Sequence, residues 1–172
     1  MTIMTLNEYQ TAAARTIATD DKADMESHAL YGLTAEIGEL LDSCYGTDLE
    51  HTIKECGDVC WMCAEFCTAH EWFLGDIVQD LDGCWGMTCA VSAAIDNGLL
   101  HGTYQKVLQG HRWDVETAKR ALGNIFRDVM GVAGCCGSAP DHVLQTNIEK
   151  LKARYPDGFS ADRSLHRADG DV

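Results

Sequence analysis

The chain carries two short acidic segments with helical character, ALYGLTAEIGELLD at residues 29–42 and IKECGDVCW at residues 53–61. Each segment contains two acidic residues spaced three positions apart: Glu36 with Glu39, and Glu55 with Asp58. Residues three apart on a helix share a face, so each pair directs two carboxylates to the same side. An antiparallel helical hairpin would bring the two pairs together. The two segments therefore predict a helical hairpin with a four-carboxylate cluster.

Such a cluster is typical of a metal site. Four carboxylates in one place repel one another unless a cation lies among them. Hard oxygen ligands in that number suit Mg²⁺ or Mn²⁺, which keep open positions for water and for substrate phosphates. Glu55 strengthens the case because it shares a helical face with Val59, Met62 and Phe66, where an uncompensated charge is costly. Acidic pairs are also common on solvated helices, and the spacing alone leaves that alternative open.

The two segments resemble the ExxE and ExxD motifs of the MazG-like, all-α nucleoside triphosphate pyrophosphohydrolases of phage and bacterial type. A third stretch, NIEKLKARYPDGF at residues 147–159, is similar to the closing segment of that family, whose Asn, Lys and Arg approach the nucleotide phosphates. Residues 7–16 also resemble the single-module members. The resemblance covers residues 5–67 and 141–163 and implies a MazG-like helical bundle.

The resemblance implies metal-dependent hydrolysis of a (deoxy)nucleoside triphosphate to the monophosphate and pyrophosphate, with attack at the α-phosphorus. Two or more Mg²⁺ ions, or Mn²⁺ in their place, would help to deprotonate water and would neutralise the phosphates. The implied catalytic and metal-binding residues are Glu36, Glu39, Glu55 and Asp58. Glu39 is the candidate to orient the water, because it is the more polar-facing residue of its pair. The expected nucleotide-binding residues are Lys54, Asn147, Lys150, Arg154 and Tyr155.

The identity of the base is less constrained. Several phage members of the family act on guanine nucleotides, which favours dGTP or GTP. The aromatic residues that could stack on a base, or equally belong to the core, are Tyr9, Trp61, Trp72 and Trp85. Two alternatives stay open: a dUTP- or dCTP-directed pyrophosphatase of the same superfamily, and a non-catalytic nucleotide-sensing helical module. The intact set of four carboxylates argues against the second.

Length and composition set wider limits. The 172 residues can bury one good core, so we expect a single domain over residues 1–172. Proline occurs only twice and helical periodicity runs through long stretches, which predicts an all-α fold. A net charge of −14 argues against a nucleic-acid-binding surface. With no signal peptide and no apolar run of about 18 residues, we expect a cytoplasmic protein, in the host cytoplasm if phage-encoded, with no membrane partner. We also expect a homo-oligomer, a dimer or a tetramer.

The other reactive residue types give no competing site. The cysteines Cys56, Cys60, Cys63 and Cys67 form one helical stripe about 16 Å long, which is too extended for one tetrahedral zinc. We interpret them as small buried hydrophobes that face another helix. The seven histidines are scattered, and the sequence contains no glycine-rich phosphate loop of the GxxxxGK[ST] type. Catalysis is therefore expected to be metal-centred.

Helix-start and helix-stop signals predict the element order. We expect helices over residues 5–19, 26–44, 75–96 and 114–134, a third helix that starts at Thr47 or Asp48 and continues to residue 70, and a last helix that starts at Ser138 or after Pro140. The polar linker at residues 19–24 would cap the second helix. The fourth helix would stop at Asn97-Gly98, followed by a glycine-punctuated connection to His111.

The middle of the chain reads as a degenerate repeat of the active helical pair at residues 26–70. Residues 31–42 align with residues 85–96, and residues 54–59 align with residues 120–125. The four acidic positions correspond to Ala90, Ala93, Ala121 and Asn124. Residues 75–136 would then mimic the second subunit of a single-module relative and carry a dead copy of the metal site. The identities are few, and chance similarity between helices stays open.

Overall fold

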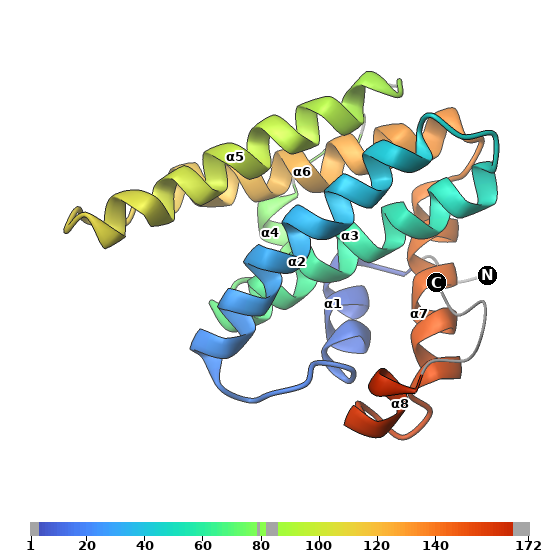
Figure 1. Cartoon of the computed structure of the whole chain (residues 1–172), viewed down its shortest axis with the longest axis horizontal. Helices are drawn as coiled ribbons and strands as arrows, with labels where there is room; N and C mark the ends of the chain where they lie inside the picture. The colour runs from blue at the N-terminus through green and yellow to red at the C-terminus, as the bar shows by residue number, and fades with distance from the viewer. Residues whose placement is uncertain (1–3, 79, 82–85, 167–172) are drawn as a thin grey trace.

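The computed structural model describes residues 4–78, 80–81 and 86–166, and every regular element in these ranges is a helix (Figure 1). The elements are α1 (Leu6–Ala14), α2 (Lys22–Ser43), α3 (Leu49–Ala69), α4 (Leu74–Ile77), α5 (Thr88–Leu108), α6 (Val115–Cys135), α7 (Pro140–Arg154) and α8 (Ala161–Leu165). The predicted all-α class is confirmed. Within the described residues, no helix combines the length and the apolar character needed to cross a membrane.

Two antiparallel helical pairs form the body of the molecule. The α2–α3 pair and the α5–α6 pair lie beside each other, and α7 runs across one side of α3 (Figure 1). Helix α3 is central, because it packs against α1, α2, α6 and α7. Its apolar faces meet those of α2 and α6 in one core, whose largest fully buried side chains include Leu33, Leu40, Phe66, Leu122 and Phe126.

Side-chain caps explain where the pairs begin. Asp21 accepts hydrogen bonds from the backbone N–H groups of Ala23 and Asp24, and it starts α2 four residues earlier than expected. Asp48 accepts from the backbone of His51 at 3.1 Å and starts α3, so of the two predicted starts Asp48 is the one observed. Helix α1 ends at Ala14 rather than at residue 19, and the chain turns there into the linker before α2.

The expected helix over residues 75–96 is wrong, and so is the glycine-punctuated connection after it. Helix α4 ends at Ile77, whereas α5 begins at Thr88 and continues through Asn97 and Gly98 to Leu108. An Asn-Gly pair often ends a helix. Here Asn97 is buried, and its Nδ2 donates to Thr34 Oγ1 on α2 at 3.2 Å. Packing against α2 therefore outweighs the local stop signal.

The cysteine stripe is part of the core. Cys56, Cys60, Cys63 and Cys67 are all fully buried. The stripe lies on the inner side of α3, where the charge of Lys119 on α6 lowers the pKa of Cys67 against the larger effect of burial. Burial raises the pKa of all four thiols, so they stay protonated at neutral pH. The prediction that they are buried small hydrophobes facing another helix is confirmed.

The two helical pairs resemble each other at one aligned glycine, where another helix crosses closely, and differ at the positions aligned with the acidic residues. The aligned Gly57 and Gly123 both lie where another helix crosses: a Cβ on Gly57 would meet Asn147 Cβ at 2.9 Å, and one on Gly123 would meet the Ile77 carbonyl oxygen at 2.8 Å. The positions that replace three of the acidic residues are fully buried alanines: Ala90, Ala93 and Ala121.

Asn124, the fourth replaced position, donates from Nδ2 to Asp96 Oδ1 at 3.3 Å. Asp96 aligns with Asp42 and not with one of the acidic ligand positions. Trp85, where the second copy would begin, lies outside the described residues. The internal repeat stays a prediction.

Candidate metal centre

Three of the predicted carboxylates converge where α2 and α3 face each other. Glu36 and Glu39 come from α2, Glu55 comes from α3, and one oxygen of each lies within 4.8 Å of the others. The tight connection between the helices, at residues 44–48, makes the hairpin antiparallel and sets the two acidic segments opposite each other. Glu39 is exposed, Glu36 is half-buried, and Glu55 is only 2% exposed.

Of the three glutamates, Glu55 has the side chain whose burial is most costly when no cation is bound. Its Oε1 lies 3.3 Å from His51 Nδ1, but its Oε2 is buried and has no hydrogen-bond partner among the described residues. A buried carboxylate oxygen without a donor costs about 1–3 kcal/mol or more. Burial, and after it the charge of Asp58, raises the pKa of Glu55. A cation at the carboxylate cluster would compensate this oxygen.

Glu36 shows the mutual repulsion most clearly. Burial comes first, followed by the charges of Asp58, Glu39 and Glu55, and together they raise the pKa of Glu36 to about 7. The Lys150 ammonium opposes this shift only in part. A divalent cation would favour the ionised carboxylate. Three converging carboxylates of graded burial fit a hard divalent cation with open positions for water or phosphate, which is the behaviour of Mg²⁺ and Mn²⁺.

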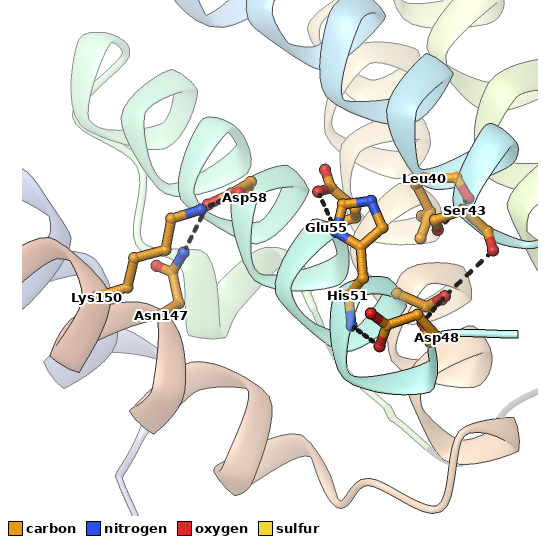
Figure 2. A network of polar contacts seen from close by, with 9 residues as sticks. Leu40, Ser43, Asp48, His51, Glu55, Asp58, Asn147 and Lys150 are labelled. Atoms are coloured by element: carbon orange, nitrogen blue, oxygen red, sulfur yellow. Dashed lines mark hydrogen bonds and ion pairs between the residues drawn. The ribbon is translucent and has the colours of Figure 1, made fainter. Parts of the chain in front are cut away.

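Asp58 lies at the edge of the cluster and is held by α7. Lys150 Nζ lies 2.6 Å from Asp58 Oδ2, and Asn147 Nδ2 donates to Asp58 Oδ1 at 3.1 Å (Figure 2). Behind them, the Tyr9 hydroxyl donates to Asn147 Oδ1 at 2.9 Å. Because Gly57 has no Cβ, α7 can come close enough for these contacts. Lys150 and Asn147 of α7 therefore compensate the charge of Asp58.

A pocket of about 310 Å³ opens in front of the carboxylates. Glu36, Glu39, Glu55 and Asp58 line one part of it, and the part formed by the C-terminal region includes Lys150, Arg154 and Tyr155. Two predicted nucleotide-binding residues lie outside this lining. Asn147 is buried behind Asp58, and Lys54 is exposed on the outer side of α3.

The aromatic residues that could stack on a base lie in different parts of the structure. Trp61 lines the pocket, whereas Tyr9 is fully buried and serves the contact with Asn147. Trp72 belongs to a separate aromatic cluster, where it stacks on Trp113 with ring centroids 5.6 Å apart. Trp85 lies outside the described residues.

A second and larger cavity, of about 700 Å³, lies between α4 and α6. Its basic residues, Lys119, Arg120 and Arg127, are matched by acidic ones. The carboxylate cluster does not line it. Because the charges of its described lining residues are mixed, these residues concentrate neither negative nor positive charge, although this cavity is the more spacious of the two.

One polar pair in the first pocket was not predicted. His28 lines the pocket, and its Nδ1 lies 2.6 Å from Oε2 of the buried Glu65. These residues are 37 positions apart and belong to no recognisable motif. Their helical positions offered the only signal: Glu65 lies on the face of α3 that carries Glu55, Asp58 and Met62.

Comparison with family models, with curated proteins and with solved structures gave no match for this chain.

Proposed function

We propose that this protein uses a divalent cation, Mg²⁺ by preference, to hydrolyse a (deoxy)nucleoside triphosphate to the monophosphate and pyrophosphate. The observation that carries the proposal is the buried, unpartnered Glu55 oxygen in a cluster of three glutamates that shares one pocket with Lys150 and Arg154. The acidic part suits a cation, and the basic part suits a polyanion. The motif resemblance at residues 29–61 and 147–159 supports the same activity.

Each part of the pocket has a role in this proposal. Glu36, Glu39 and Glu55 would hold the metal, with two or more ions in the complete site. The bound ions would supply positive charge for the attack of water at the α-phosphorus. Glu39 is the most exposed of the three glutamates, and it is the candidate to orient that water.

The α7 side of the pocket would bind the phosphates. Lys150 now neutralises Asp58 at 2.6 Å, and Arg154 lies one helical turn further along α7. A cation at the carboxylates would compensate Asp58 in place of the ammonium group, so that Lys150 could turn to the triphosphate. Asn147 would keep Asp58 in position through its amide.

The proposal extends to a cytoplasmic protein that acts on the nucleotide pool as a homo-oligomer. Three apolar side chains on one face of α5 support self-association, because Val91, Ile95 and Leu99 are 52%, 68% and 41% exposed. Light scattering of the wild type and of the Ile95→Glu variant tests this part. A monomeric wild type would contradict it.

The activity is tested by incubating the protein with each of the eight common NTPs and dNTPs, with Mg²⁺, with Mn²⁺ or with EDTA, and separating the products. We expect monophosphate and pyrophosphate only with metal, and a preference for dGTP or GTP. Glu36→Gln and Glu55→Gln should each lower turnover by at least about 100-fold. Glu149→Gln, on the exposed side of α7, is the matched control.

Each other outcome has a defined meaning. A preference for dUTP or dCTP would assign the protein to that branch of the superfamily. Metal-dependent nucleotide binding without turnover would favour the non-catalytic sensing module. If both glutamine variants were as active as the wild type, the carboxylate cluster would not be the active site.

A further inference from the structure

The His28–Glu65 pair gives the pocket a fixed imidazole. Glu65 is 2% exposed, and its Oε2 lies 2.6 Å from His28 Nδ1. A buried carboxylate requires compensation, and His28, which is cationic when protonated, is the partner that the described contacts provide. The His28 side chain itself is half exposed and lines the pocket. With Nδ1 bound to Glu65, Nε2 is the nitrogen left for a ligand.

A second ring is fixed beside it. Trp61 Nε1 donates to Thr16 Oγ1 at 3.0 Å, which holds the indole plane in place. The Trp61 and His28 rings meet edge to face, with centroids 6.0 Å apart. Both residues line the same pocket as the carboxylates. His28 precedes Glu36 by eight residues on α2, or about 12 Å along the helix axis, which is the scale of a nucleoside triphosphate.

We propose that His28, oriented by Glu65, donates a hydrogen bond from Nε2 to the keto oxygen at C6 of a purine or C4 of a pyrimidine, and thereby selects guanine, hypoxanthine, uracil or thymine over adenine and cytosine. The inference rests on the proposed function for the identity of the ligand as a nucleotide. Trp61 would supply the apolar wall for the base.

The direction of the hydrogen bond follows from the pair. When His28 is protonated, both of its ring nitrogens are donors, so it can donate to Glu65 and to a base oxygen at the same time. The exocyclic amino group of adenine or cytosine is itself a donor and would face another donor. The hydrogen bond to Glu65, together with the charges of Glu65 and Glu36, raises the pKa of His28 above its ordinary value of 6.5, against the effect of burial.

Matched nucleotides isolate the edge of the base that is read, because each pair differs only in a keto oxygen or an amino group and in the protonation of the adjacent ring nitrogen. ITP and ATP differ at purine C6, and UTP and CTP differ at pyrimidine C4, where a keto oxygen replaces an amino group. Their α,β-methylene analogues, which are not cleaved at the α-phosphorus, allow binding to be measured by calorimetry in the presence of Mg²⁺. We expect the wild type to bind the keto member of each pair roughly 10- to 100-fold more tightly.

Substitutions of His28 and Glu65 test whether these two residues cause the preference for keto bases. His28→Ala should bring each ratio close to one by weakening the keto ligand, and the control His111→Ala, at an exposed histidine outside the pocket, should leave the ratio unchanged. If His28→Ala fails to fold because Glu65 is left buried and unpaired, the double variant with Glu65→Gln removes that charge. Circular dichroism checks the fold of each variant.

Glu65 is a positioning residue in this scheme, and a pH profile tests it. Glu65→Gln should lower the pKa of His28, as followed by NMR of the imidazole. Keto selectivity should then be weaker than in the wild type at pH 8, and it should return as the pH falls below the His28 pKa that NMR gives for the variant. A purely structural role for Glu65 would lower binding of all four analogues both above and below that pKa.

Several results would overturn the inference. One is equal binding of both members of each pair by the wild type, and another is no nucleotide binding at all. A third is an equal loss of affinity for the keto and amino ligands in His28→Ala, which would indicate a phosphate contact. Keto-selective binding without turnover would support the inference and reject the enzymatic proposal. Turnover without keto selectivity would reject the inference alone.

Discussion

Replacing Glu36 with glutamine should stabilise the metal-free protein at pH 8 and abolish most of its stabilisation by Mg²⁺. Burial, and after it the charges of Asp58, Glu39 and Glu55, raises the pKa of Glu36 from 4.5 to about 7. Between these values the folded protein holds a proton that the unfolded chain has released. The stability of the metal-free fold therefore falls as the pH rises from about 4.5 to 7.

The size of this loss can be bounded. A difference of that size between the two pKa values corresponds to at most about 3 kcal/mol. Because Glu36 is only half-buried, solvent screening reduces the expected effect to about 1–2 kcal/mol. Glutamine carries no charge, so Glu36→Gln should be more stable than the wild type by about that amount at pH 8 and nearly equal to it at pH 4.5. In the wild type, Mg²⁺ at about 100 times its dissociation constant should stabilise the fold by about 2.7 kcal/mol.

Urea unfolding followed by circular dichroism measures both effects. The free energy of unfolding is determined at pH 4.5 and pH 8, with EDTA or with Mg²⁺, for the wild type, Glu36→Gln and the control Glu149→Gln. The control should behave like the wild type. If Glu36→Gln were less stable than the wild type at pH 8 in EDTA, or were stabilised by Mg²⁺ to the same extent, the electrostatic description of the cluster would be refuted.

Other predictions concern the contacts around the cluster. Gly57→Ala should lower the free energy of unfolding by about 1–3 kcal/mol, because the new Cβ would meet Asn147 Cβ at 2.9 Å. Denaturant unfolding measures this loss against the control Gly98→Ala, whose new Cβ would meet nothing within 4 Å. An equal effect of both substitutions would contradict the prediction. Lys150→Ala should weaken triphosphate binding by roughly 1–3 kcal/mol in calorimetry, whereas unchanged affinity would remove Lys150 from the phosphate site. Asp58→Asn should lower turnover by at least about 100-fold while circular dichroism shows unchanged helicity, and normal turnover would show that this carboxylate is dispensable.

The sequence predicted the hairpin well because its signals are local. Asp48 caps α3 through its own side chain, and the acidic spacing fixes which faces of α2 and α3 carry the carboxylates. The burial of the cysteine stripe also followed from helical periodicity alone. These features depend on residues within a few turns of one another.

Features that depend on contacts between distant segments were predicted less well. The helix end expected at Asn97 failed because packing against α2, with a hydrogen bond from the buried Asn97 to Thr34, keeps α5 continuous. The pairing of Lys150 with Asp58 spans 92 residues, and that of His28 with Glu65 spans 37. No local pattern encodes either distance. The sequence could identify acidic and basic groups, but not which of them neutralise one another.

The central claim is most directly tested by phosphorus NMR of a reaction run in ¹⁸O-water with Mg²⁺ and the preferred triphosphate. Attack at the α-phosphorus predicts monophosphate and pyrophosphate as the only products, with the label in the monophosphate. Diphosphate and orthophosphate, or label in the pyrophosphate, would contradict the account.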